Sequence, residues 1–152
     1  MTGGRAFCVI KASEKFEAID EVIASCPVLS SLPADYVKAV HRREDLQSTD
    51  IGHGVAIAHG KVAHLEKVRI ALGFSERGVV FKHGPVEPVR LLFVIASDPL
   101  KESQYVTALS AILWWVHDPA FRALLINKQW DDERVSRFLA MLETQDFTGK
   151  YR

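Results

Sequence analysis

Three observations predict an α/β protein with a mixed sheet. Short apolar segments alternate with longer segments of helical periodicity, which indicates strands and helices packed in layers. The segment 89–96 is almost entirely apolar, as in a central strand buried on both faces. The polar segment 75–78 joins two strand-like segments, 68–74 and 79–81, and so short a turn allows only antiparallel pairing.

Length and composition indicate one ordinary globular domain. The chain has 152 residues, of which 48% are hydrophobic and 25% charged. Its net charge is zero with histidine neutral, which argues against a general electrostatic role with nucleic acid or a membrane surface. No apolar run is long enough to span a bilayer, and the first residues are too quickly polar for a signal peptide. We expect a cytoplasmic domain over residues 1–152, with its core at about 13–143 and flexible ends.

Caps and periodicity divide the rest of the chain into elements. Ser13 can cap a helix that ends near Cys26, and Pro33 suits the first turn of the next helix. Further along the chain, Asp118 can cap another helix, with Pro119 in its first turn. The expected elements are, in order, a strand at 7–10, helices at 13–26 and 31–44, strands at 55–58, 68–74, 79–81 and 89–96, a helix at about 103–117, and helices that begin at 119 and 131.

The long helix at 103–117 should pack by one apolar stripe. Its positions at helical spacing are Val106, Leu109, Ile112, Leu113 and Val116. Trp114 and Trp115 are adjacent on this helix, so only one of them can face the core well. The other is expected under the following helix or at a subunit contact.

Neither the cysteines nor the histidines have the spacing of a metal site. Cys8 and Cys26 lie far apart and are expected to be reduced, buried and small apolar residues. His53, His59 and His64 are separated by six and five residues, which matches no standard ligand pattern. We therefore expect no metal and no cofactor.

The segment 43–60 contains the candidate reactive and anion-binding residues. A short apolar strand there leads into His59 and Gly60, which would present one imidazole at the rim of the sheet. Imidazole is a competent nucleophile near neutral pH, and the guanidinium of Arg43 suits an anionic group. Spacing alone favours a hydrogen-bonded rim histidine and a solvated arginine, and it leaves a nucleophile with an anion clamp as the alternative.

The same segment resembles a known family. The pattern R-E-x-x-x-S-T-x-I-G-x-G-x-A-I-x-H-G, which runs from Arg43 to Gly60, is similar to that of the fructose/mannitol-type EIIA domains of the bacterial phosphotransferase system, including the nitrogen-regulatory branch. The likeness continues at 88–93 (P-V-R-L-L-F) and 109–110 (L-S) and covers about residues 13–143. It implies a mixed sheet with helices on both faces.

The resemblance also implies a function. It makes His59 the residue that carries a phosphoryl group and Arg43 the active-site arginine. The implied donor is the phosphocarrier protein HPr or a paralogue, and the implied acceptor is a cysteine of an EIIB partner that serves sugar uptake. The alternative is a regulatory module whose phosphorylation state selects its partner protein. A lone domain is compatible with both functions, and a homodimer is compatible with the sequence.

Four positions depart from the family pattern. His53 stands where the family has Asn or Glu, Asp50 where it has Gly, and Ala58 where it has Pro. Tyr105 occupies the position of a second active-site histidine, and it cannot take up a proton as imidazole does. One hypothesis is that Tyr105 and His53 share the pocket with His59 and tune it. The alternative is that Tyr105 packs on the sheet and His53 caps a turn.

Two hydroxyls complete the candidate site. Ser48 and Thr49 are candidates for contacts to the phosphoryl oxygens. Their residue types suit turns and caps equally well, and the sequence favours that structural role.

Overall fold

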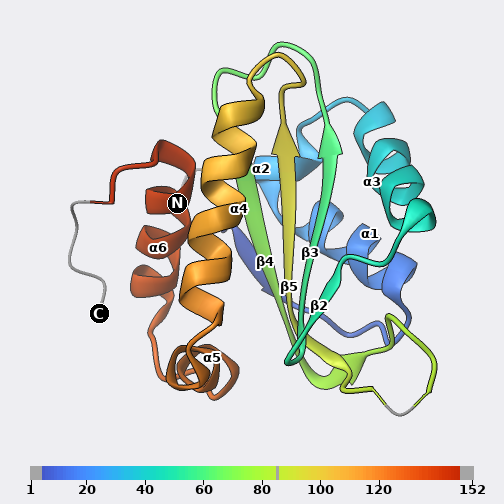
Figure 1. Cartoon of the computed structure of the whole chain (residues 1–152), viewed down its shortest axis with the longest axis vertical. Helices are drawn as coiled ribbons and strands as arrows, with labels where there is room; N and C mark the ends of the chain where they lie inside the picture. The colour runs from blue at the N-terminus through green and yellow to red at the C-terminus, as the bar shows by residue number, and fades with distance from the viewer. Residues whose placement is uncertain (1–4, 85, 148–152) are drawn as a thin grey trace.

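A five-stranded sheet with strand order β1-β4-β5-β3-β2 forms the centre of the computed structural model, which describes residues 5–84 and 86–147 (Figure 1). Two strand pairs, β1–β4 and β3–β5, are parallel, and two, β4–β5 and β2–β3, are antiparallel. The predicted mixed sheet is therefore confirmed. The strands are β1 (Phe7–Val9), β2 (Asp50–Gly52), β3 (Val55–Lys61), β4 (Arg69–Val79) and β5 (Val89–Ser97).

The prediction of a turn at 75–78 is wrong. These residues lie inside β4, where the register against β5 shifts between Phe74 and Val79. Ser75 Oγ accepts a bond from the backbone N–H of Gly78 at 2.9 Å, and Gly78 has a φ of 93°. The segment thus has the local chemistry of a turn, but it forms an irregularity within one strand. The antiparallel partner of β4 is β5, which follows after a loop.

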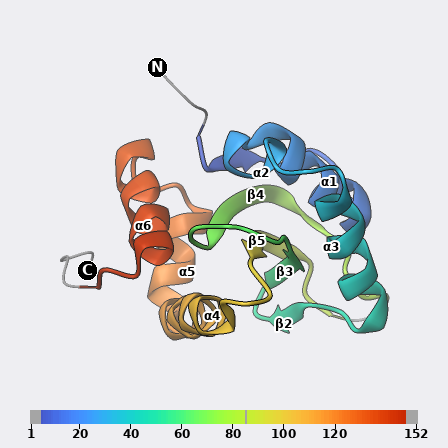
Figure 2. The same ribbon diagram turned by 90° about the horizontal axis from the view of Figure 1, so that it is seen from above.

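Helices cover both faces of the sheet (Figure 2). On one face α1, α2 and α3 enclose an apolar core, and on the other α4, α5 and α6 enclose a second core. Strand β5 lies in the middle of the sheet and contributes to both cores, as its apolar sequence predicts. The helices are α1 (Lys15–Ser25), α2 (Pro27–Ser30), α3 (Asp35–Leu46), α4 (Glu102–Val116), α5 (Pro119–Ile126) and α6 (Asp132–Thr144).

Several sequence expectations for the helices hold and others fail. Asp118 and Asp131 cap α5 and α6 as expected, whereas Glu14 rather than Ser13 caps α1, and the short helix α2 was not foreseen. In α4 the predicted stripe is partly wrong, because Val106 and Leu113 are exposed. Of the two tryptophans, Trp115 joins an aromatic cluster that includes Phe138, while Trp114 is 58% exposed. The expected flexibility of the chain ends concerns in part residues 1–4 and 148–152, which lie outside the described residues.

Helix α3 packs very closely against β3, and Gly60 makes this possible. A Cβ added at Gly60 would lie 2.8 Å from Val40 Cγ2, 3.0 Å from Val40 N and 3.2 Å from Tyr36 Cε1. The same helix is held to the central strand, because the buried Tyr36 hydroxyl donates to the carbonyl oxygen of Ile95 at 2.8 Å. The glycine after the histidine is therefore explained by the approach of α3.

We expect Gly60→Ala to destabilise the fold. The new methyl group would clash with a β-branched side chain and with backbone, and overpacking of this kind typically costs about 1–3 kcal/mol. Urea denaturation of the variant and of the wild type measures the difference in free energy of unfolding. Val40→Ala removes Cγ2, so it should recover part of the loss in the Gly60→Ala background. A Gly60→Ala protein as stable as the wild type would contradict this packing.

Candidate functional site

His59 lies near the C-terminal end of β3, at a part of the strand that β2 does not reach. It is opposite Ile95 of β5, whereas β2 pairs with the beginning of β3, with Asp50 opposite Ala56. The strand extends through His59 to Lys61, beyond the expected end. The histidine is 9% exposed, so the imidazole is almost completely buried at the rim of the sheet.

Tyr105 of α4 covers the imidazole. The two rings stack with centroids 4.2 Å apart and planes inclined by 21°. Lys61 lies on the same side, with its Nζ 5.4 Å from the centre of the Tyr105 ring and in an ion pair with Glu102 at the start of α4. The structure thus places Tyr105 directly on His59, and it adds a cation and a carboxylate beside them.

Arg43 reaches the same site from α3. An open pocket of about 630 Å³ lies between this helix and β3, and its lining includes Arg42, Arg43, His59, Gly60 and Lys61. One guanidinium nitrogen of Arg43, Nη1, donates to the carbonyl oxygen of Gln47 at 2.9 Å. The helix that packs tightly on Gly60 therefore brings an arginine to the histidine. The charged side chains that line the pocket are three cations, Arg42, Arg43 and Lys61, and one carboxylate, Asp45.

Burial and positive charge together keep His59 neutral. Burial, followed by the charges of Lys61 and Arg43, lowers the pKa of the imidazole to about 4, against a smaller opposing effect of Glu102. The Nδ1 atom is buried and has no hydrogen-bond partner among the described residues. Burial also raises the pKa of the Tyr105 phenol, so its hydroxyl remains a neutral hydrogen-bond donor. Because Nδ1 is enclosed, Nε2 is the ring nitrogen left as the candidate for contact with a group in the pocket.

We expect an NMR titration of the His59 ring to show a midpoint near pH 4, because its pKa is lowered to about 4. In the unfolded chain the pKa should be near 6.5, so the unfolded state takes up the proton first as pH falls. The contribution of a neutral His59 to stability is therefore present above about pH 6.5 and is lost as pH falls toward 4. Lys61→Met should raise the midpoint. A wild-type midpoint near 6.5 would contradict the electrostatic description.

Ser48 and Thr49 are not among the residues that line the pocket. The Thr49 hydroxyl donates to Glu44 Oε1 at 2.6 Å, and its backbone N–H donates to the other oxygen of the same buried carboxylate at 3.1 Å. Ser48 Oγ accepts a bond from the backbone N–H of Asp50 at 3.2 Å. Both hydroxyls stabilise the connection from α3 to β2.

The structure does not bring His53 to His59. His53 and Gly54 form the tight turn between β2 and β3, and three consecutive residues there have positive φ, with 89° at Gly52, 58° at His53 and 77° at Gly54. This turn precedes β3, whereas His59 is near the other end of the strand. Six residues of extended chain span roughly 20 Å. His53 is an exposed turn residue, which is the placement that the alternative interpretation described.

The sequence analysis did not identify Lys61 and Arg42 as residues that line the pocket. The signal for Lys61 was available, because residues two apart in a strand point to the same face, and Lys61 follows His59 by two. Arg42 precedes Arg43 in the last turns of α3, and both line the pocket.

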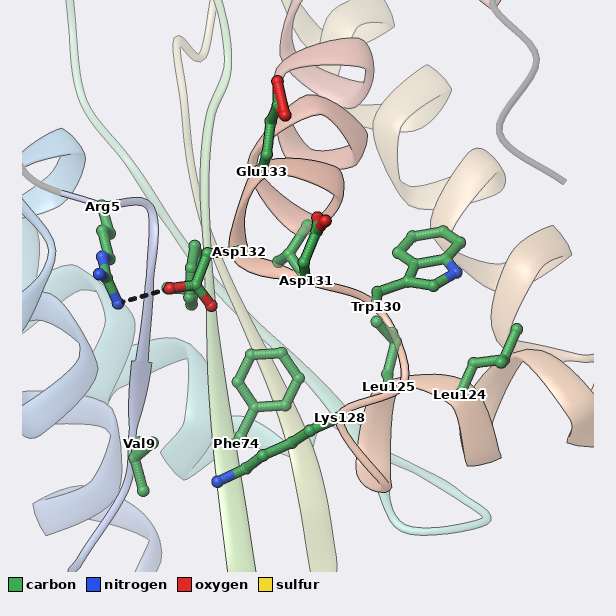
Figure 3. A pocket seen from close by; sticks show the side chains of 12 residues that line it. Arg5, Val9, Phe74, Leu124, Leu125, Lys128, Trp130, Asp131, Asp132 and Glu133 are labelled. Atoms are coloured by element: carbon green, nitrogen blue, oxygen red, sulfur yellow. Dashed lines mark ion pairs between the residues drawn. The ribbon is translucent and has the colours of Figure 1, made fainter.

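A second pocket lies at the opposite edge of the sheet, between β1 and the loop from α5 to α6 (Figure 3). It has a volume of about 640 Å³ and a mixed lining, in which apolar side chains such as Phe74 and Trp130 stand beside the charged residues Arg5, Lys128, Asp131, Asp132 and Glu133. Its Arg5 pairs with Asp132 at 3.0 Å. The buried side-chain atoms that lack a hydrogen-bond partner in the described chain belong to His59 and Ser97, away from this pocket. The unpaired buried polar atoms therefore lie on the side of the His59 pocket and not at this second pocket.

Comparisons with known proteins agree with this fold and identify its family. Residues 4–141 match the family model described as phosphoenolpyruvate-dependent sugar phosphotransferase system, EIIA 2. This match covers most of the chain, and the chain belongs to that family. Its members are phosphotransferase components, linked to sugar transport and to regulation.

Individual relatives come from both branches. The chain is 30% identical over 125 residues to the fructose-specific EIIABC component of Bacillus subtilis. The matched segment makes up 81% of this chain but only 20% of that protein. It is 29% identical over 110 residues to a nitrogen regulatory protein of Bradyrhizobium diazoefficiens, which covers 72% of each. The first relative is thus about five times longer than the matched part.

Solved structures share the fold. The nitrogen regulatory protein IIA-Ntr of Neisseria meningitidis has a TM-score of 0.75 at 25% identity and covers 88% of this chain and 91% of its own. IIA mannitol of Escherichia coli has a TM-score of 0.65 at 26% identity and covers 88% of this chain and 94% of its own. In the described part of the chain, no helix combines the length and apolar character needed to cross a membrane.

Proposed function

We propose that this protein is a phosphoryl carrier that accepts phosphate on His59 from an HPr-like protein and passes it to a cysteine of an EIIB protein. The observation that carries the proposal is the environment of the imidazole. It is buried and neutral, with Nδ1 enclosed and with Arg43 and Lys61 beside it. Those cations suit the charge on phosphoryl oxygens, and the family membership supports the same reaction class.

The reaction needs little covalent chemistry from the protein. The Nε2 lone pair attacks the phosphorus, a bond from His59 to phosphorus forms, and the bond between phosphorus and the donor breaks. In the second step the thiolate of the EIIB cysteine attacks the same phosphorus, and the imidazole of His59 leaves as a neutral group. Positioning and charge neutralisation therefore decide the rate.

The test is reconstitution of the transfer. The protein is incubated with labelled phosphoenolpyruvate, enzyme I and HPr, and the label should be acid-labile and base-stable, as expected for phosphohistidine. Adding EIIB should then move the label. EIIB is the partner to test first. A protein with the fold of this chain occurs in a solved complex of mannitol enzyme IIA with phosphorylated enzyme IIB of Escherichia coli. Absence of label with an active enzyme I and HPr would overturn the proposal.

A second candidate function is regulation. The observation that favours it is the likeness to regulatory relatives, because the chain is 29% identical to a nitrogen regulatory protein and shares the fold of IIA-Ntr with a TM-score of 0.75. In that case His59 would still be phosphorylated, but EIIB would not remove the label. A partner protein would instead bind only one of the two phosphorylation states.

A further inference from the structure

Two buried polar atoms near one another in the sheet have no hydrogen-bond partner. Among the described residues, the side-chain atoms in this condition are Nδ1 of His59 and Oγ of Ser97. His59 is 9% exposed and Ser97 is 1% exposed. Buried polar groups are almost always paired in native proteins, so two exceptions in one part of the sheet call for an explanation.

The register places both side chains on the same face of neighbouring strands. In β3 the residue Ile57 belongs to the core under α4, and His59 follows it by two. In β5 the residue Ile95 belongs to the same core, and Ser97 follows it by two. His59 is opposite Ile95 and the next same-face position of β3 is opposite Ser97, so His59 and Ser97 are diagonal neighbours.

Phosphoryl acceptance by His59 depends on which ring nitrogen carries the proton, and Ser97 lies where it could influence this. For Nε2 to attack, its lone pair must be free, so the proton of the neutral ring must be on Nδ1. Which ring nitrogen carries the proton is set by the hydrogen bond that the other nitrogen, or its own N–H, makes. A buried Nδ1–H needs an acceptor, and a serine hydroxyl can accept while it donates elsewhere.

We infer that Ser97 is a positioning residue that holds His59 in the Nδ1–H form, either after a change of the Ser97 χ1 rotamer that moves Oγ toward Nδ1 or through one buried water. A water that bridges two polar groups serves nearly as well as a direct hydrogen bond. The inference deepens the proposed function and rests on it for the effect on rate. The tautomer itself is a property of the unphosphorylated protein.

The experiment compares Ser97→Ala with the wild type in two measurements. Long-range ¹H–¹⁵N spectra of the unphosphorylated protein identify the protonated nitrogen of His59. The wild type should carry the proton on Nδ1, and Ser97→Ala should move part of the population to Nε2. Labelling by phosphorylated HPr should slow by about tenfold, by analogy with the partners that orient metal-binding histidines, whose loss typically costs 10–100-fold.

Ser75→Ala is the matched control. Ser75 is also buried, at 6% exposure, but its Oγ bonds to Gly78 within β4. This variant should keep the His59 tautomer and the labelling rate of the wild type. Ser97→Cys, which is close in size to serine but a weak hydrogen-bond partner, replaces Ser97→Ala if the alanine variant does not fold.

The outcomes separate the two proposals. A wild type with the proton on Nε2, or a Ser97→Ala protein with an unchanged tautomer and rate, overturns the role of Ser97. A wild type that takes up no label overturns the proposed function, while the NMR measurement still decides the role of Ser97. A shifted tautomer together with slower labelling supports the inference.

Discussion

His59→Ala should take up no phosphoryl label from phosphorylated HPr. The substitution removes the imidazole, and a pocket that retains Arg43 and Lys61 can still attract an anion but offers no nucleophile. Label uptake from phosphoenolpyruvate through enzyme I and HPr measures the loss. The fold should persist, because the ring lies at the rim of the sheet, and circular dichroism checks this.

His53→Ala is the control for that experiment. It removes another imidazole, from an exposed turn at the beginning of β3, and it should leave labelling at the wild-type level. Undiminished label on a folded His59→Ala protein would assign the phosphorylation site to another residue. Loss of label in His53→Ala as well would show that labelling depends on the turn between β2 and β3, despite its distance from His59.

Arg43→Lys should slow phosphoryl transfer by about 10²–10³, or roughly 3–4 kcal/mol of transition-state stabilisation, as for the loss of one preorganised charge contact. One arm of the Arg43 guanidinium is bound to the Gln47 carbonyl oxygen, which fixes the group and leaves the remaining donors for an anion. Lysine keeps the charge but has no planar set of donors that could do both. Single-turnover transfer from phosphorylated HPr gives the rate.

Arg42→Lys is the matched control, because it makes the same chemical change at the preceding residue of the same pocket. It should have little effect on the rate if Arg43 is the residue that contacts the phosphoryl group. Unchanged kinetics in a folded Arg43→Lys protein would reassign Arg43 to a capping role at the end of α3. A larger effect at Arg42 would exchange the two roles.

The sequence predicted most of the architecture because the relevant signals are local. The apolar segment that became β5 and the caps at Asp118 and Asp131 depend on neighbouring residues alone. The segment 75–78 misled for the same reason, since its serine bond and positive φ are features of a turn. Whether such a feature ends a strand or only bends it depends on the register with β5, which is a long-range property.

The candidate site could be predicted only in part. The motif identified His59 and Arg43, and the stacking of Tyr105 on His59 fits the hypothesis of a shared pocket. The position of His53 needed the direction of β3, and the importance of Ser97 needed the pairing of two strands that are distant in sequence. Sequence periodicity indicates which face a side chain occupies, but it does not indicate which strand lies beside it.

The contact of α3 with β3 at Gly60 holds Arg43 beside His59, and this has a consequence for thermal inactivation. His59 projects toward the core under α4, whereas Arg43 belongs to the helix that covers the other core. If either helical layer opens by subglobal unfolding, the two residues separate while most of the sheet remains intact. Transfer activity should therefore decline at a lower temperature than the global melting transition, and amide hydrogen exchange in α3 should accelerate in the same interval.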